Sequence, residues 1–218
     1  MSQRIELGYN FKDKTLLLRA LTHTSAAKKP TDSNERLEFL GDRILNMLVA
    51  ELLDETFPKE REGDVAKRLT TLVCAPALAE IALEIGLDKA VIVSPAEAAT
   101  GGATKMNVLA DAMEALIAAL YRDGGLDAAR TLVRAHWTQR LQTDAKPPQD
   151  AKSELQEWAQ GRGLPLPVYE VLDRSGPDHA PVFVVSVTVK GLTPAKGEGA
   201  SKREAEKHAA ETMLGQLP

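Results

Sequence analysis

The chain has 218 residues, which is enough for one large domain or for a larger and a smaller one. Its hydrophobic fraction of 44% supports a packed core, yet no apolar run approaches the length of a membrane-spanning helix. Asp and Glu outnumber Lys and Arg by 31 to 27, so the overall charge gives no sign of nucleic-acid binding, and any basic surface must be local.

Two features of the sequence favour a cytoplasmic protein without a membrane segment. The first residues, MSQRIELGYNFKDK, contain no apolar stretch of the kind that a signal peptide needs. The single cysteine, Cys74, excludes an internal disulfide. Because its neighbours are apolar, we expect Cys74 to be a small packed side chain rather than a catalytic thiol.

Residues from about 12 to 142 are predicted to be almost wholly helical, because apolar residues recur there every three to four positions. Gly and Pro residues separate the expected helices, which cover residues 12–25, 37–57, 66–86, 108–125 and 126–141. Asn107 is a suitable N-terminal cap for the fourth of them. This all-α region is the first predicted domain, residues 1–143.

A polar segment centred on Pro147 and Pro148 follows and is predicted to be a linker over residues 144–149. Beyond it the apolar period changes. We expect residues 150–218 to form a small α+β domain in the order α-β-β-β-α, with two helices covering one face of the sheet.

Two patterns support this second domain. In VFVVSVTVK, residues 182–190, apolar and polar residues alternate as in a half-buried strand, with Phe183 and Val185 on the buried face. Ser201 and Glu204 match the S-x-x-E capping box and are expected to begin the last helix.

Three acids stand close together in ERLEFLGD, residues 35–42. Glu35, Glu38 and Asp42 are spaced i, i+3 and i+7, which places them along one face of a helix. Most acidic stripes of this kind simply face solvent. Here the helix is apolar over a wide arc, so solvation alone is a weaker explanation.

A second acidic pair, Asp111 and Glu114, lies in VLADAMEALIAAL, a stretch that is apolar almost all round and therefore belongs inside the protein. Two ionised carboxylates there lose hydration and repel each other, which raises at least one pKa. A hard divalent cation such as Mg²⁺ would offset the charge. We therefore expect the two helices to face each other, with Mg²⁺, or Mn²⁺ in its place, bound by Glu38, Asp42, Asp111 and Glu114.

Other metal chemistries fit less well. A di-iron bundle would need Glu-x-x-His, but positions 41 and 117 are Gly41 and Ile117. Zinc favours clusters of His and Cys, which 4 scattered His and 1 Cys do not supply. His23 is expected to be a packing residue or a cap. A site made only of carboxylates indicates phosphoryl chemistry.

The stretch NERLEFLGDRIL closely resembles the signature of the bacterial ribonuclease III family. The resemblance extends through ALTHTS, REGD and VLADAMEALIAALYRDGG, and LQEWAQGRGLPLPVYEV, GPDHAPVFVVSV and GEGASKREAEKHAAETML resemble a double-stranded-RNA-binding domain. It implies a homodimeric, Mg²⁺-dependent endonuclease that cuts double-stranded RNA. The implied products carry 5′-phosphate and 3′-hydroxyl ends, and processing of ribosomal and messenger RNA is the expected role.

The resemblance also implies roles for individual residues. Glu35 corresponds to a further acid at the cleavage centre. Glu62, in REGD, corresponds to an acid near the scissile strand, although a solvent-exposed loop acid would look the same. Phe39 corresponds to an apolar residue at the subunit interface, so one face of its helix would serve the metal and another the dimer. The metal-binding acids are Glu38, Asp42, Asp111 and Glu114, all of them catalytic.

In the second domain the resemblance implies RNA contacts on two helices and one loop. Free N–H groups and the helix dipole at the start of the last helix favour phosphate, and Gly197 and Gly199 are expected to let the backbone approach the nucleic acid. From Gln149 onward the net charge is only −2, so one copy should bind weakly and a dimer should gain through avidity. The implied contacts are Gln156, Glu157, Pro177, His179, Ser201, Lys202, Arg203 and Lys207.

Two other functions fit the sequence less well than an endonuclease for double-stranded RNA. A non-catalytic double-stranded-RNA-binding protein on a nuclease-like scaffold would be expected to lack at least one of the acids, and all of them are present. A helical phosphohydrolase acting on nucleotides would lack the His-Asp pair that such enzymes often use, and it would leave the second domain unexplained.

Overall fold

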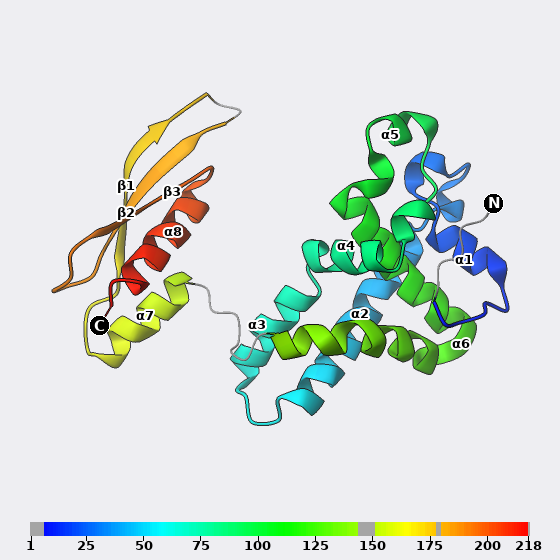
Figure 1. The fold of residues 1–218 in the computed structure, drawn as a ribbon, viewed down its shortest axis with the longest axis horizontal. Coiled ribbons are helices and arrows are strands. Elements are labelled where there is room, and N and C mark those ends of the chain that lie inside the picture. The colour runs from blue at the N-terminus through cyan, green and yellow to red at the C-terminus, as the bar shows by residue number, and fades with distance from the viewer. Residues whose placement is uncertain (1–6, 144–150, 178–179, 218) are drawn as a thin grey trace. The chain divides into compact units, whose positions relative to one another are not determined.

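The computed structural model describes residues 7–143, 151–177 and 180–217. They belong to two compact units, Met1–Pro148 and Gln149–Pro218, each of which is described by itself (Figure 1). The predicted linker, residues 144–149, lies outside the described residues. None of the helices in the described ranges combines the length and the hydrophobicity that crossing a membrane requires.

Unit 1 is helical, as the apolar periodicity predicts. Its two longest helices, α2 and α6, pack against each other, and the shorter helices pack around them (Figure 1). Leu45, Leu53 and Met113 are fully buried between these helices. The helices are α1 (Lys14–Ala20), α2 (Glu35–Thr56), α3 (Glu62–Leu72), α4 (Ala75–Glu84), α5 (Pro95–Ala99) and α6 (Met106–Thr143), with 3-10 turns at Thr24–Ala26, Pro30–Asp32, Leu87–Lys89 and Gly102–Thr104.

Two predicted helices end earlier than expected. The helix predicted over residues 66–86 is divided into α3 and α4 at Cys74, whose backbone is extended with φ −74° and ψ 155°. Proline lacks the N–H that a continuous helix needs, and Pro76 is tolerated because it lies in the first turn of α4. The helix predicted over residues 12–25 ends at Ala20.

The fourth and fifth predicted helices form the single element α6, with a break where glycine was expected to separate them. Gly125 has φ 77° and ψ −175°, a conformation that is not helical. The prediction that Asn107 caps this helix is wrong. Asn107 lies inside the first turn, and the carbonyl of Lys105 accepts the hydrogen bond from the N–H of Leu109 at 3.0 Å.

The two central helices approach each other most closely where Gly41 of α2 meets Glu114 of α6. A Cβ atom at position 41 would collide with the backbone carbonyl of Glu114, so glycine is required there. Small residues on α6 have the same effect, because Ala115 and Ala118 are fully buried beside Leu37. Glycine inside a helix costs about 0.5–1 kcal/mol relative to alanine, which the close packing of the two helices offsets.

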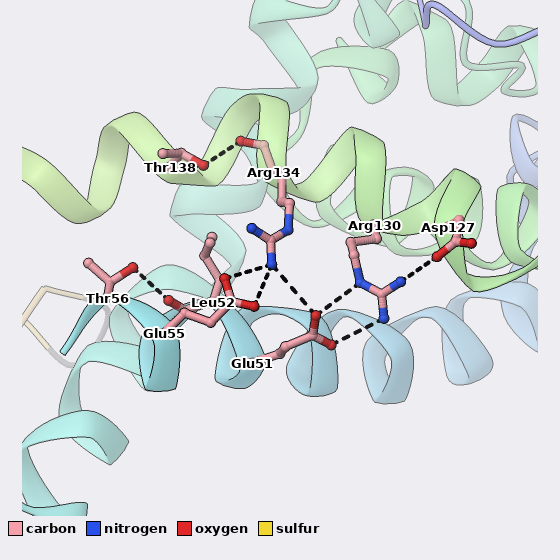
Figure 2. A network of polar contacts seen from close by, with 8 residues as sticks. All are labelled: Glu51, Leu52, Glu55, Thr56, Asp127, Arg130, Arg134 and Thr138. Atoms are coloured by element: carbon pink, nitrogen blue, oxygen red, sulfur yellow. Dashed lines mark hydrogen bonds and ion pairs between the residues drawn. The ribbon is translucent and has the colours of Figure 1, made fainter. Parts of the chain in front are cut away.

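A network of ion pairs joins the second half of α6 to the C-terminal half of α2 (Figure 2). Arg130 donates from Nε and Nη2 to the two carboxylate oxygens of Glu51, at 3.0 and 3.2 Å. Arg134 donates from Nη2 to both oxygens of Glu55, at 2.6 and 2.7 Å. The hydrogen bond from Arg130 is the main cause of the lowered pKa of Glu51. The network holds α6 against α2 beyond the break in α6.

Unit 2 has the predicted order α-β-β-β-α. Its strands form an antiparallel sheet in the order β1-β2-β3, and both helices lie on one face of it (Figure 1). The predicted alternation is confirmed, since Val185 and Val187 are fully buried on that face. The elements are α7 (Ala151–Gly161), β1 (Val168–Ser175), β2 (Val182–Thr188), β3 (Ala195–Gly199) and α8 (Lys202–Leu214).

The predicted capping box is present with one difference. Ser201 Oγ accepts a hydrogen bond from the N–H of Glu204 at 3.2 Å, as predicted. The Glu204 carboxylate accepts its hydrogen bond from the N–H of Ala200, at 2.7 Å, rather than from that of Ser201. Both bonds satisfy donors at the start of α8, which is the purpose of the motif.

The expectation that Gly197 and Gly199 admit nucleic acid is wrong. A Cβ atom at position 197 would collide with the backbone of Ala209, and one at position 199 would lie 2.7 Å from the backbone nitrogen of Ala205. Both positions therefore face α8. Their lack of a side chain lets α8 pack directly on β3.

We predict that Gly41→Ala destabilises unit 1, although alanine normally favours a helix. Overpacking against a backbone group costs about 1–3 kcal/mol, which exceeds the gain of about 0.5–1 kcal/mol from replacing glycine. Gly63→Ala is the matched control, because Gly63 lies in α3 with open space at its Cβ position. Urea unfolding should give a lower free energy of unfolding for Gly41→Ala only. Equal stability of the two variants would contradict the close contact at Gly41.

Candidate active site and nucleic-acid interface

Three carboxylates from two helices meet beside the contact at Gly41. Glu38 lies one turn before Gly41 on α2, and Asp111 and Glu114 lie one turn apart on α6. All three residues are partly buried, and none of their side chains forms a hydrogen bond or ion pair with another described residue. Three of the four predicted metal-binding acids thus lie close enough for their charges to affect one another's pKa, and they have no salt-bridge partner among the described residues.

The surroundings of these acids disfavour their charged forms. Burial, followed by the charges of Glu38 and Asp111, raises the pKa of Glu114 to about 7. Burial is also the main cause of the raised pKa of Glu38, to which Asp111 and Glu35 add. Burial raises the pKa of Asp111, and His23 partly offsets this effect. All three shifts have the same direction, because burial disfavours the charged form of each carboxylate.

Asp42, the fourth predicted metal-binding acid, has other partners in this structure. Arg43 forms an ion pair with its Oδ2 atom, and Asn46 Nδ2 donates to its Oδ1 atom at 2.9 Å. The charge of Arg43 also offsets a small part of the rise in the pKa of Glu114. Neither Arg43 nor Asn46 was among the predicted site residues. The i, i+4 spacing of Asp42 and Asn46 on a helix was the signal that could have identified Asn46.

Glu35 and Glu62 lie in different places relative to this site. Glu35 is in the first turn of α2, where Ser33 Oγ donates to its Oε2 atom at 3.2 Å. Its charge acts on Glu38, so it belongs to the acidic site. Glu62 begins α3, which follows the opposite end of α2, about 30 Å along the helix from Glu35. Within one chain, Glu62 is therefore not brought to the other acids.

The chemistry of the acidic site fits a hard divalent cation. As they are placed, no three Asp, Glu, His or Cys side chains in residues 7–143, 151–177 and 180–217 form a group that could hold a metal ion. Carboxylate oxygens are nevertheless the ligands that Mg²⁺ prefers. Three half-buried carboxylates that lack a bonded partner would be stabilised by such an ion.

His23 has the cap role that was one of its two predicted roles. Its Nδ1 atom accepts a hydrogen bond from the N–H of Ser25 at 3.2 Å, at the start of a 3-10 turn. Its charge also acts on Asp111. This second effect has no signal in the sequence, because the two residues are far apart along the chain.

An exposed apolar stripe lies on another part of α2. Phe39 is 69% exposed, and the guanidinium carbon of Arg43 lies 5.4 Å from the centre of its ring. Met47, about two turns further along the helix, is 47% exposed. Two large apolar side chains on one exposed helix surface are suited to contact with another protein surface.

The predicted RNA contacts of unit 2 that the structure describes lie on its surface. An ion pair between Lys152 of α7 and Glu206 of α8 joins the two helices near the start of α8. Among the described residues, Lys202 forms one long ion pair, from its Nζ atom to Oε1 of Glu206 at 3.8 Å, so its ammonium group remains accessible. The predicted contact at His179 lies outside the described residues. The exposed residues are Gln156, Glu157, Pro177, Ser201, Lys202, Arg203 and Lys207.

Comparison with known proteins finds two similarities that together span most of the chain. Residues 13–141 match the Ribonuclease-III-like family, and residues 151–217 match the double-stranded RNA binding motif. Proteins named ribonuclease 3 from Caulobacter vibrioides and Brucella canis are 50% and 49% identical, over 95% of this chain and over 91% and 84% of the relatives. The nuclease domain of ribonuclease III from Campylobacter jejuni is 41% identical, with a TM-score of 0.57, over 61% of this chain and 94% of that one.

We predict that Glu114→Gln stabilises the metal-free protein at alkaline pH. The folded-state pKa of about 7 lies above the usual 4.5, so the folded state favours the protonated form, and stability is lost as the pH rises through about 7. The shift corresponds to at most about 3 kcal/mol, which partial exposure to solvent reduces to about 1 kcal/mol.

Urea unfolding in EDTA at pH 8 should therefore give a higher free energy of unfolding for the variant, and the difference should disappear near pH 4.5. Glu80→Gln, which changes an exposed acid of α4, is the control and should show no such dependence. If the stability gained by Glu114→Gln over the unmodified chain were the same at pH 8 as at pH 4.5, the Glu114 carboxylate would not be destabilised by its surroundings.

Proposed function

Because this chain belongs to the ribonuclease III family and is an endoribonuclease for double-stranded RNA, we propose that its catalysis depends on Mg²⁺ bound by the acidic site. The ligands are Glu38, Asp42, Asp111 and Glu114, with Glu35 at the edge of the site. We propose that cleavage leaves 5′-phosphate and 3′-hydroxyl ends and that ribosomal and messenger RNA precursors are among the substrates.

One observation carries the metal assignment. Glu38, Asp111 and Glu114 are half-buried, have raised pKa values and have no bonded partner among the described residues. A fold normally pairs such carboxylates with Arg or Lys or leaves them in water. Their arrangement is explained if a divalent cation is the partner.

The residues of this chain prepare the site in three ways. The contact at Gly41 fixes the separation of the carboxylates on α2 from those on α6. Asn46 holds one oxygen of Asp42 and so orients that carboxylate, while Arg43 neutralises it when no ion is bound. Mg²⁺, when bound, would polarise the scissile phosphate and promote attack by water.

We propose that the chain acts as a homodimer through the stripe of Phe39 and Met47. Both side chains are exposed on α2, close in sequence to the acids of the same helix. The nuclease domain of ribonuclease III from Campylobacter jejuni has a structurally flexible region that is involved in dimer formation. A two-fold dimer of this chain would place two acidic sites on one duplex, so that each subunit cuts one strand.

The second unit supports binding of the duplex. Double-stranded RNA is recognised mainly by shape, through phosphates and 2′-hydroxyl groups. Lys202 and Arg203 stand in the first turn of α8, where the helix dipole also favours phosphate. Lys207 lies about one turn further along the same helix and is exposed. We propose these three cations as its main phosphate contacts.

We predict that Glu114→Gln reduces cleavage of a long RNA duplex in Mg²⁺ by about 100-fold or more, because it removes a ligand that acts in the transition state. Binding of the duplex should remain. EDTA should abolish cleavage by the unmodified chain, and Glu80→Gln should cleave normally. Mapping of the product ends checks the proposed 5′-phosphate and 3′-hydroxyl. Normal cleavage by Glu114→Gln, or cleavage in EDTA, would refute the metal site.

We predict that Phe39→Asp converts the protein into a monomer, because a charge at the centre of an apolar contact cannot be desolvated without a partner. Leu83→Asp is the matched control, since Leu83 is a similarly exposed apolar residue of α4. Sedimentation equilibrium should give a dimer for the unmodified chain and for Leu83→Asp, and a monomer for Phe39→Asp. A monomeric unmodified chain, or a dimeric Phe39→Asp variant, would exclude this interface.

A further inference from the structure

A small pocket lined by two lysines lies directly beside the acidic site and shares Glu35 with it. The segment between α1 and α2 folds back so that Lys28 and Lys29 line the pocket together with Glu35, the outermost acid. Thr24 and the buried Ser33 also line it. The pocket therefore lies at the N-terminal end of α2, next to the first-turn acids Glu35 and Glu38.

The two lysines of this pocket carry uncompensated charge. Lys28 and Lys29 are exposed, and neither forms an ion pair with any residue in the described ranges. Glu35 lines the same pocket, but its carboxylate takes a hydrogen bond from Ser33 rather than from a lysine. Many other cations of unit 1 are paired with acids, among them Arg43, Lys105, Arg130, Arg134 and Arg140.

A third cation lies close to the two lysines. On its other side Lys28 lines a second pocket with Arg19 and Asp32, and the Nε atom of Arg19 donates to the carbonyl of Ser33 at 3.2 Å. Glu35 and Glu38 already stand in the first turn of α2, at the positive end of the helix dipole. The lysines therefore supply the charge that would attract an anion here.

The pocket is small, with a volume of about 260 Å³. This space is large enough to admit one phosphodiester group of a larger ligand. The acids repel the phosphates of an RNA strand at the acidic site unless nearby cations offset that repulsion.

We propose that Lys28 and Lys29 bind a backbone phosphate of the RNA strand next to the one that is cut, and so position that strand at the acidic site. This inference rests on the proposed function, because it assumes that the acidic site acts on RNA. It assigns to unit 1 part of the phosphate binding that unit 2, whose net charge is −2, is expected to supply only weakly. Lys28 and Lys29 are positioning residues, since they contact the substrate away from the reacting atoms.

The test uses the full chain in three variants. Lys28→Gln/Lys29→Gln removes the two charges, and Lys28→Arg/Lys29→Arg keeps them. Lys14→Gln/Lys89→Gln is the matched control, because Lys14 and Lys89 are exposed, form no ion pair within the described ranges and do not line the pocket. Circular dichroism and thermal unfolding confirm that each variant is folded.

Two measurements distinguish positioning from a structural role. With a long RNA duplex in Mg²⁺, the Gln variant should show a KM raised about 10-fold and a kcat changed by less than about 2-fold. In EDTA, the slope of log Kd against log salt concentration should fall by about 1 per subunit, because one phosphate contact is lost. The Arg variant should stay close to the unmodified chain on both measurements.

The outcomes separate this inference from the proposed function. If the unmodified chain cleaves the duplex and the Gln variant matches the Lys14→Gln/Lys89→Gln control in KM and salt slope, the assignment of Lys28 and Lys29 is wrong and the acidic site is unaffected. If the unmodified chain does not cleave the duplex at all, the proposed function itself fails.

Discussion

The contact between Gly41 and the backbone of Glu114 determines how close α2 and α6 can come, and the rest of the site depends on that distance. A single additional methyl group at position 41 would push the helices apart. Because Glu38 lies one turn from Gly41 and Asp111 one turn from Glu114, any such separation would move one pair of carboxylates away from the other. Packing in the core and the geometry of the site are therefore set by the same contact.

This arrangement places the carboxylates of Glu38, Asp111 and Glu114 between two helices that are otherwise largely apolar. The buried alanines and leucines around the acids exclude water, which raises the pKa of each carboxylate and strengthens their repulsion. Ion pairs elsewhere on the same two helices, such as Arg130 with Glu51, are by contrast more exposed and fully paired. On these two helices arginine thus pairs with the exposed acids Glu51 and Glu55, whereas the acids at the Gly41 contact have no such partner among the described residues.

Much of this could be predicted from the sequence, because apolar periodicity reports which side of a helix is buried. An acid such as Glu114 on a helix that is apolar almost all round must lie inside. The cost of burying its charge led to the prediction that α2 and α6 face each other and share their acids around a cation. Periodicity does not report which neighbour a residue meets. For that reason Gly197 was assigned to the nucleic acid when it faces α8, and Arg43 and the pocket at Lys28 were missed. The break at Cys74 was also missed, because the helical periodicity runs through it and the proline that follows was not weighed.

The most direct test of the central claim is the binding of Mn²⁺, measured by electron paramagnetic resonance at pH 8 with the unmodified chain and with Glu114→Gln. If the carboxylates of α2 and α6 share an ion, the unmodified chain will show saturable binding, and the variant will bind at least about ten-fold more weakly. Equal binding by both proteins, or no saturable binding by the unmodified chain, would contradict a metal site at the contact between these helices.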